Sequence, residues 1–213
     1  VEQLRGGVEG LLGHKLITLV RGKAAFKDAH TVVVTSSPVM SSEVETSEYS
    51  ADYIIIATGS VSASLPIPGA DLPGILTSRE ILDLEEVPQR LCVIGGGVIG
   101  LEFASVFRSF GSEVTVLEYF KEILPRFDSD LSKRLKQSLG KRGIEINTQA
   151  QVTAIEEVPA VISTEGGDRV EKSIYKVSFT RKGKEEVVEA DKVLMAVGRK
   201  ANVGSLNLAD VGI

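Results

Sequence analysis

The chain has few of the residues that build disulfides and metal centres. It contains one cysteine, two histidines and no tryptophan in 213 residues. A single cysteine, Cys92, excludes an intrachain disulfide, and with only His14 and His30 beside it the chain lacks the usual ligands of a zinc or haem site. We therefore predict no metal site. The cysteine count is consistent with a reducing compartment.

An excess of positive charge is also missing, as are long apolar runs. Lys and Arg number 24 against 29 Asp and Glu, so the formal net charge is −5, and no basic stripe is present to neutralise a nucleic-acid backbone. No apolar run approaches the ~20 residues that span a bilayer, and no signal-peptide pattern opens the chain. We expect no nucleic-acid or membrane partner. With 43% hydrophobic and 25% charged residues, the composition is typical of one or two folded domains.

Breaker residues divide the chain into two parts. Residues 61–75 contain three prolines and two glycines and predict a linker. Before it, residues 1–12 predict an amphipathic helix, 31–35 a β-branched strand, and 36–50 a surface loop or an edge hairpin. The apolar run 53–57 is too short for a helix and predicts a strand buried on both faces.

Helical and strand patterns alternate after the linker. The predicted elements are a helix at 77–84, a strand at 91–94, a helix at 99–110, a strand at 113–117, a helix at 129–141 and a strand at 144–146. This order predicts a parallel sheet with helices on its faces. Residues 151–158 and 174–190 then alternate with a period of two, which indicates an antiparallel meander, and 193–197 predicts a last buried strand.

A glycine motif lies between the first strand and helix of the parallel part. Gly95-Gly96-Gly97-Val98-Ile99-Gly100 has the pattern G-x-G-x-x-G, and its strand–turn–helix context is the one that binds a dinucleotide. Gly95 permits the tight turn, Gly97 lets the backbone approach a pyrophosphate, and Gly100 lets the helix lie close to the sheet. The helix N-terminus then offers free N–H groups to the phosphates. A glycine turn without a ligand is the alternative.

An acidic residue closes the next predicted strand, 21 residues after Gly97. Glu118 is placed to accept hydrogen bonds from the hydroxyls of an adenine ribose, and the residues that follow it, Tyr119 and Phe120, are not basic. A 2′-phosphate would meet a carboxylate there, so NAD is favoured over NADP. The alternative is a solvent-exposed glutamate at the end of a strand.

The residues alone provide no catalytic group. Glu102 lies among apolar neighbours on the predicted helix, where an exposed position is equally consistent. Cys92 is expected to be a small, inert, buried residue. No nucleophile, acid–base pair or metal cluster could support chemistry without a redox cofactor.

Five ordered motifs together resemble one enzyme family. They are Ala57-Thr58-Gly59-Ser60, the triple-glycine motif, Leu101-Glu102, Glu118 and Val197-Gly198-Arg199. Over its whole length the chain resembles the flavin-dependent pyridine nucleotide disulfide oxidoreductases, above all the branch that oxidises dihydrolipoamide. The resemblance implies a Rossmann-like NAD-binding domain at 70–197, with a parallel sheet plus an antiparallel meander, nested in part of an FAD-binding domain at 1–69. Residues 198–213 would begin the return to the FAD domain.

The resemblance also implies site residues. For NAD they are Gly95, Gly96, Gly97, Val98, Ile99, Gly100, Leu101, Glu102, Glu118, Val152 and Gly198. Val98 would cover the nicotinamide pocket, Glu102 would lie near the hydride-transfer path, Val152 beside the adenine and Gly198 near the nicotinamide. For FAD the implied residues are Ala24, Thr58, Gly59 and Ser60, and Ala24 departs from the glycine that the family usually has.

Several family motifs do not occur in the chain. These are the FAD-binding G-x-G-x-x-G, the redox pair C-x4-C, the Gly-Asp motif of the flavin ribityl chain and the His-Glu base. The pair Gly167-Asp168 does not replace the Gly-Asp motif, because residues 165–169 predict a turn. We therefore expect a central piece of an enzyme, inactive alone. The intact parent would oxidise protein-bound dihydrolipoamide to lipoamide and reduce NAD⁺ through FAD. Its implied partner is a lipoyl-bearing protein of a 2-oxo acid dehydrogenase or glycine cleavage complex, and a cytoplasmic or organelle-matrix homodimer is expected.

Two alternatives remain at this point. The parent could be an NADH oxidase, a mercuric reductase or a soluble transhydrogenase of the same superfamily, which share this region. A chain from another class, a non-enzymatic module that senses NAD(H), would use the same glycine turn. Such a module has no use for the run 53–57 and the Thr-Gly-Ser that follows it.

Overall fold

The computed structural model describes residues 2–36, 45–163 and 169–213, and for 160–163 and 169–172 it describes the backbone alone. The chain forms two compact units, one of Val1–Ser60 with Ala201–Ile213 and one of Val61–Lys200. The sequence predicts these boundaries between residues 69 and 70 and between residues 197 and 198. Where the chain passes between the units, β4 (Ser60–Ser62) and β13 (Arg199–Ala201) pair with each other.

The first unit is built on a small antiparallel sheet. Its strands β1 (Lys23–Asp28), β2 (Thr31–Thr35) and β3 (Thr46–Ser50) lie in chain order. Phe26 of β1 is buried and donates its N–H to the carbonyl of Leu206, which precedes the short 3-10 helix η2 (Leu208–Val211). The helix α1 (Glu2–Leu12) has no buried residue. β3 gives the expected edge hairpin with β2, while residues 37–44 of the predicted loop lie outside the described residues.

The prediction of a buried strand at 53–57 is wrong for this structure. These residues belong to no helix or strand, and Tyr53 and Ile55 are 91% and 89% exposed. An apolar run becomes a buried strand only when neighbouring strands accept its backbone hydrogen bonds and cover its faces. Within the described residues no strand does so here.

The second unit contains a five-stranded parallel sheet in the order β5-β12-β6-β7-β8. Its strands are β5 (Ile75–Leu76), β6 (Arg90–Ile94), β7 (Glu113–Glu118), β8 (Ile144–Thr148) and β12 (Lys192–Met195). All four neighbouring pairs are parallel, as the alternation of strands and helices predicts. The fold class is confirmed.

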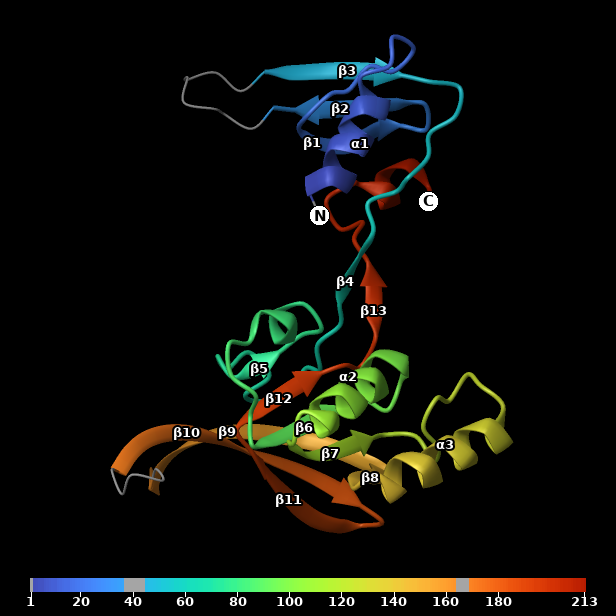
Figure 1. Cartoon of the computed structure of the whole chain (residues 1–213). Helices are drawn as coiled ribbons and strands as arrows, with labels where there is room; N and C mark the ends of the chain where they lie inside the picture. Colours follow the sequence, from blue (N-terminus) through green and yellow to red (C-terminus); the bar gives the residue numbers. More distant parts are fainter. Residues whose placement is uncertain (1, 37–44, 164–168) are drawn as a thin grey trace. The chain divides into compact units, whose positions relative to one another are not determined.

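Helices cover one face of this sheet (Figure 1). They are α2 (Val98–Ser109) and α3 (Ser129–Lys141). Leu101, Ala104 and Phe107 of α2 pack with Leu91 and Val93 of β6 in one core, which is the apolar stripe expected of an amphipathic helix. Asp128 caps α3, because its side chain accepts the N–H of Asp130.

An antiparallel meander covers the other face (Figure 1). It consists of β9 (Ala150–Ser163), β10 (Arg169–Arg181) and β11 (Lys184–Ala190). Val177 and Phe179 of β10 pack with Cys92 and Ile94 of β6 in a second core. Alternate residues of β6 therefore face the helices and the meander, which explains why this strand is apolar throughout.

One predicted helix is shorter than expected. Residues 77–84 form only the 3-10 helix η1 (Glu80–Asp83), and the backbone becomes extended at Leu84. The Glu80 carboxylate accepts hydrogen bonds from the N–H of Thr77, at 2.9 Å, and from the Thr77 hydroxyl. The hydrogen bond from the hydroxyl holds the pKa of Glu80 below its ordinary value. The N-cap is Arg79, which makes no side-chain capping hydrogen bond, and only Ile81 is buried, so neither a cap nor packing stabilises a further turn. No helix in the described ranges is long and apolar enough to cross a membrane.

Candidate dinucleotide site

A cavity of about 510 Å³ opens at the carboxyl ends of the parallel strands. Ile94, Leu117 and Ala196, from the ends of β6 and β7 and just beyond β12, form its floor. Ligands of open α/β sheets bind at this edge, where the loops that follow the strands converge. The cavity lies wholly within the second unit.

The glycine turn forms one wall of the cavity. Gly95 has φ +112°, which favours glycine, and a Cβ there would lie 2.4 Å from the carbonyl oxygen of Ala196. A Cβ at Gly100 would lie 2.1 Å from the carbonyl oxygen of Gly95. The first turn of α2 is therefore pressed against the end of β6, and neither position has room for a side chain.

Gly97 differs from these two glycines. It is the N-cap of α2, has φ −78° and would meet nothing within 4 Å if it had a Cβ. Neither the backbone conformation nor packing requires glycine at this position. The missing side chain instead leaves open space beside the cavity at a helix N-terminus, where backbone N–H groups and the helix dipole favour an anion.

Glu118 lies at the end of β7 with its carboxylate against the glycine turn. It is 5% exposed, which excludes the solvent-exposed alternative. One carboxylate oxygen accepts the N–H of Gly96 at 2.5 Å, and the other accepts the N–H of Phe120 at 2.7 Å. Because each carboxylate oxygen has two acceptor sites, both can take a further hydrogen bond from a ligand in the cavity.

Three parts of the cavity were not found from the sequence. Leu65–Ile67, inside the predicted linker, forms one wall, and Gln151 joins the predicted Val152 on another. Tyr119 and Phe120 line the cavity with rings in edge contact at 5.4 Å between centroids. Of these three parts, only the aromatic pair has a signal in the sequence. Two adjacent aromatic residues directly after the acidic residue provide flat apolar surface for a base.

The predicted NAD residues divide into two groups. Gly95, Gly97, Glu118, Val152 and Gly198 line the cavity together. The others do not line it. Gly96, Gly100 and Leu101 are buried, Ile99 lines a small neighbouring pocket, and Val98 and Glu102 are exposed on α2.

The predicted FAD residues all lie in the first unit. Ala24 is in β1 and half-buried, and Thr58 and Gly59 are exposed in the irregular segment before β4. The backbone and side-chain N–H groups of Asn202 hold this segment through the carbonyls of Gly59 and Thr58, at 3.0 and 3.4 Å. Ser60 opens β4.

Cys92 has no redox role in this geometry. Its side chain is 0% exposed between the sheet and the meander. Burial raises the pKa of the thiol to about 12, and a thiol rather than a thiolate is a poor nucleophile. The prediction of an inert buried cysteine is confirmed.

Comparison with known proteins places these features in a family context. The family described as pyridine nucleotide-disulphide oxidoreductase matches residues 1–213. The dihydrolipoyl dehydrogenase of Staphylococcus aureus is 37% identical over 214 residues, which cover 100% of this chain and 41% of that protein. The dihydrolipoyl dehydrogenase of Acholeplasma laidlawii is 36% identical over 206 residues, or 95% of this chain and 53% of that protein.

Solved structures give the same picture. The HOCl-induced flavoprotein disulfide reductase RclA from Escherichia coli superimposes with a TM-score of 0.73 and 30% identity, and a Cu(II) complex of a mutant of that protein superimposes with a TM-score of 0.77. Both matches cover 100% of this chain and 43% of the other. The chain thus spans about two fifths to half the length of the relatives described here.

Proposed function

Since the chain belongs to the pyridine nucleotide-disulphide oxidoreductase family, we propose that it is the NAD(H)-binding portion of a dihydrolipoyl dehydrogenase. The observation that supports this most directly is the convergence of Gly95, Gly97 and Glu118 on one cavity of about 510 Å³. This volume is in the range of small-molecule and cofactor sites. The helix N-terminus with open space at Gly97 and the buried carboxylate of Glu118 border the same cavity, as the pyrophosphate and ribose sites of a dinucleotide do.

Each group would hold one part of the nucleotide. The space at Gly97 and the first N–H groups of α2 would take the pyrophosphate. The free acceptor sites of Glu118 would bind the ribose hydroxyls, and Val152 with the aromatic pair Tyr119 and Phe120 would border the adenine. When bound, the nicotinamide would supply the hydride acceptor, whereas the protein binds, orients and shields it.

The charge of the site favours NAD over NADP. Glu118 is buried and its carboxylate bonds to the turn, so a 2′-phosphate would lie against a carboxylate in a partly desolvated cavity. Repulsion between two anions is strongest where water does not screen them. Among the described residues no lysine or arginine lines this cavity to offset it.

The remaining functional predictions rest on the resemblance. In the intact parent, FAD would bind through the domain to which Ala24 and Thr58–Ser60 belong, and a lipoyl-bearing protein of a 2-oxo acid dehydrogenase or glycine cleavage complex would be the substrate. Val98 and Glu102, on the exposed side of α2, would act at the nicotinamide end. A cytoplasmic or organelle-matrix homodimer is the expected form.

The test compares two glycines that are equally free of neighbours. A Cβ at Gly97 or at Gly140 would meet nothing within 4 Å, but only Gly97 borders the cavity. Gly97→Ala is expected to lower NADH affinity about tenfold, or roughly 1.4 kcal/mol. Its cost in stability should stay near ~1 kcal/mol, the cost of alanine at an N-cap. Gly140→Ala is expected to leave affinity unchanged. Fluorescence titration with NADH, together with urea unfolding of both variants, measures this difference.

Glu118 provides the second arm of the test. Glu118→Ala is expected to weaken NADH binding by about 1 to 2 kcal/mol, as the loss of charge-assisted hydrogen bonds would. Because Glu118 also holds the N–H groups of Gly96 and Phe120, Glu118→Gln, which keeps one acceptor oxygen, separates ribose binding from support of the turn. Tighter binding of NADPH than of NADH by the unmodified chain would overturn the assignment.

A further inference from the structure

A second cavity, of about 400 Å³, lies in the same unit and has a different chemistry. It is lined by residues of α3, of the end of β8 with the turn that follows it, and of the β10–β11 hairpin. Its charged lining consists of Lys136, Arg181, Lys182, Lys184 and Glu186. None of these residues lines the dinucleotide cavity. We call this second cavity the basic cleft.

The basic cleft has an excess of positive charge in a chain that is acidic overall. Four cations face one carboxylate, whereas the whole chain has a net charge of −5. Of the described residues that line it, Ile146 alone is apolar. Concentrated charge of one sign in a concave site attracts a ligand of the opposite sign, and the near absence of apolar lining disfavours an aromatic or lipid ligand.

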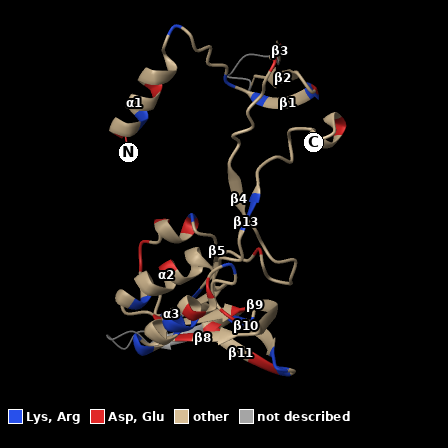
Figure 2. Cartoon of the chain, turned by 90° about the vertical axis from the view of Figure 1, so that its right-hand side faces the viewer, with Lys and Arg blue, Asp and Glu red and all other residues tan. Residues whose placement is uncertain are grey.

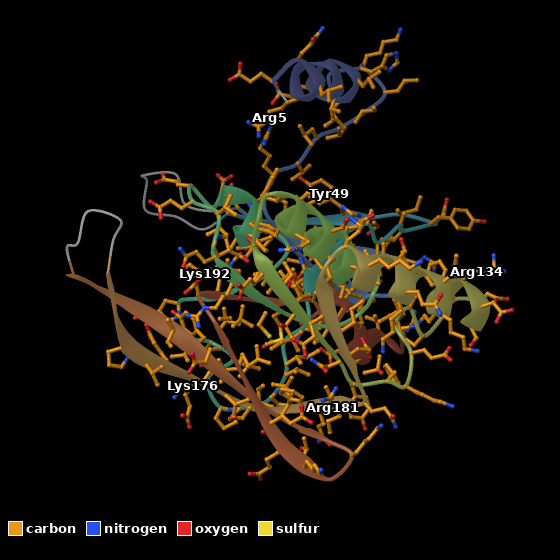
Figure 3. All side chains as sticks on the ribbon, turned by 60° about the horizontal axis from the view of Figure 1, so that its bottom comes forward. Arg5, Tyr49, Arg134, Lys176, Arg181 and Lys192 are labelled. Atoms are coloured by element: carbon orange, nitrogen blue, oxygen red, sulfur yellow. The ribbon has the colours of Figure 1, made fainter. Side chains whose placement is uncertain are left out.

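Arg181 forms an ion pair with Glu186, the one carboxylate that lines the cleft. Its Nε and Nη2 donate to the two carboxylate oxygens of Glu186, at 3.0 and 2.8 Å, and its Nη1 donates to Oδ1 of Asn147. The amide nitrogen of Asn147 in turn donates to Glu145 at 2.9 Å. Arg181, at the hairpin in Figure 3, is thus a fixed and largely neutralised wall of the cleft.

Lys136 reaches the cleft from α3, whose basic residues are blue in Figure 2. Its ammonium donates to the hydroxyl of Thr148 at 3.1 Å, and the residue is half-buried. Burial, and to a lesser degree the charge of Arg181, lowers the pKa of Lys136 from its ordinary value. An anion in the cleft would offset that charge repulsion and favour the charged ammonium.

Lys182 and Lys184 complete the cleft from the hairpin. Lys182 and Gly183 form the two-residue turn with φ +51° and +75°, the left-handed pair that such a turn requires. Asparagine or glycine is usual at the first of these positions, and here a lysine occupies it. Within the part of the chain that the structure describes, no carboxylate lies within ion-pair distance of Lys136, Lys182 or Lys184.

We propose that the basic cleft binds a small polyphosphate, with inorganic pyrophosphate as the simplest example. Three lysines that have no carboxylate partner among the described residues line one space of about 400 Å³. Ammonium groups bind phosphate oxygens as point charges. A monocarboxylate would offset only one of the three charges. A nucleic acid would require a basic surface that extends beyond this cleft, which the acidic chain does not provide.

The experiment must distinguish the cleft from the glycine turn, which also attracts phosphates. The backbone amide NMR spectrum of the ¹⁵N-labelled chain is titrated with pyrophosphate at about 0.1 M salt. We expect shifts at residues 148–149 and 181–184 that saturate together. The double variant Lys182→Gln with Lys184→Gln should lose at least tenfold in affinity, and Gly97→Ala should lose less than twofold.

A charge-matched control accompanies these variants. Lys23→Gln with Lys141→Gln removes two exposed lysines outside the cleft and should change pyrophosphate affinity less than twofold. Equal loss in both double variants would show attraction to net charge alone and overturn the proposal. So would shifts confined to residues 95–101, or the absence of any shift at millimolar pyrophosphate.

Discussion

Two apolar runs in this molecule are alike in sequence and opposite in structure. Tyr53-Ile54-Ile55-Ile56-Ala57 and Leu91-Cys92-Val93-Ile94 are both short, rich in β-branched residues and followed closely by a glycine with positive φ. The second run forms the last four residues of β6, and its side chains are at most 3% exposed. The first forms no strand, and Ile55 is 89% exposed.

The difference lies in the neighbours of each run. β6 pairs with β12 and β7, and it is covered by α2 on one face and by the meander on the other. The run 53–57 has no such neighbours within the described residues. Strand propensity is thus a statement about fitting a covered, hydrogen-bonded surface, and the same pattern gives a core strand only where that surface exists.

The largest difference in stability between the two runs is expected when a charged side chain is introduced into each of them. Val93 is 0% exposed, so Val93→Asp should destabilise the second unit by more than about 4 kcal/mol, since a carboxylate without partners is buried. Circular dichroism during urea unfolding measures this loss. If Val93→Asp does not fold, the loss in free energy of unfolding is measured with Val93→Ala, for which we expect about 2 kcal/mol. A loss below about 1 kcal/mol for either would contradict the described packing.

Substitution of the glycines that follow the two runs should give a smaller difference in stability. Gly95→Ala combines the strain of φ +112° with a Cβ only 2.4 Å from the carbonyl oxygen of Ala196, and we expect a loss of about 2 to 5 kcal/mol. Gly59 has φ +74° but no neighbour within 4 Å of a Cβ. Gly59→Ala should therefore cost only the strain, about 1 to 2 kcal/mol. Equal losses in thermal or urea unfolding would mean that the two turns are equally crowded.

At alkaline pH, a buried thiol in one run and an exposed thiol in the other should affect the free energy of unfolding differently. Burial raises the pKa of Cys92 from 9.0 to about 12, so the unfolded chain releases this proton first. Stability is therefore complete below pH 9 and falls as the pH rises from 9 towards 12, by about 2 kcal/mol at pH 10.5. Cys92→Ala with Ile55→Cys moves the thiol to the exposed run and should lack this loss.

Comparison of the unfolding free energies of both proteins at pH 8 and pH 10.5 isolates the thiol, because the other titrating groups are common to both. Tyr175, whose pKa burial also raises, contributes equally to the two curves. Identical pH dependence would show that Cys92 is accessible to water in the folded chain, contrary to its full burial.

Local signals predicted much of the fold. The helix Ser129–Lys141 and the strand Thr31–Thr35 have the expected limits, since a cap, an amphipathic stripe or a β-branched run is encoded by adjacent residues. The run 53–57 and the predicted helix at 77–84 failed for one reason. Both needed packing partners that the described structure does not provide, and no local pattern reports whether a partner is present.

The candidate site divides in the same way. Gly95, Gly97 and Glu118 were found because a strand, a turn and a spacing of 21 residues are readable along the chain. The wall at Leu65–Ile67 comes from a segment that composition identifies only as a linker. The basic cleft joins Lys136 with Lys182, which are 46 residues apart in sequence, and only the tertiary fold brings them together.

The smallest effect is expected on the exposed run itself. Ile55→Asp should change the free energy of unfolding by less than about 0.5 kcal/mol, since an exposed side chain has no packing to lose. Leu16→Asp, at an 83% exposed position outside both runs, serves as the control. If Ile55→Asp instead costs several kcal/mol, something covers this run in solution. A loss that grows with protein concentration would identify a second copy of the chain as that cover, because stability that comes from association depends on concentration.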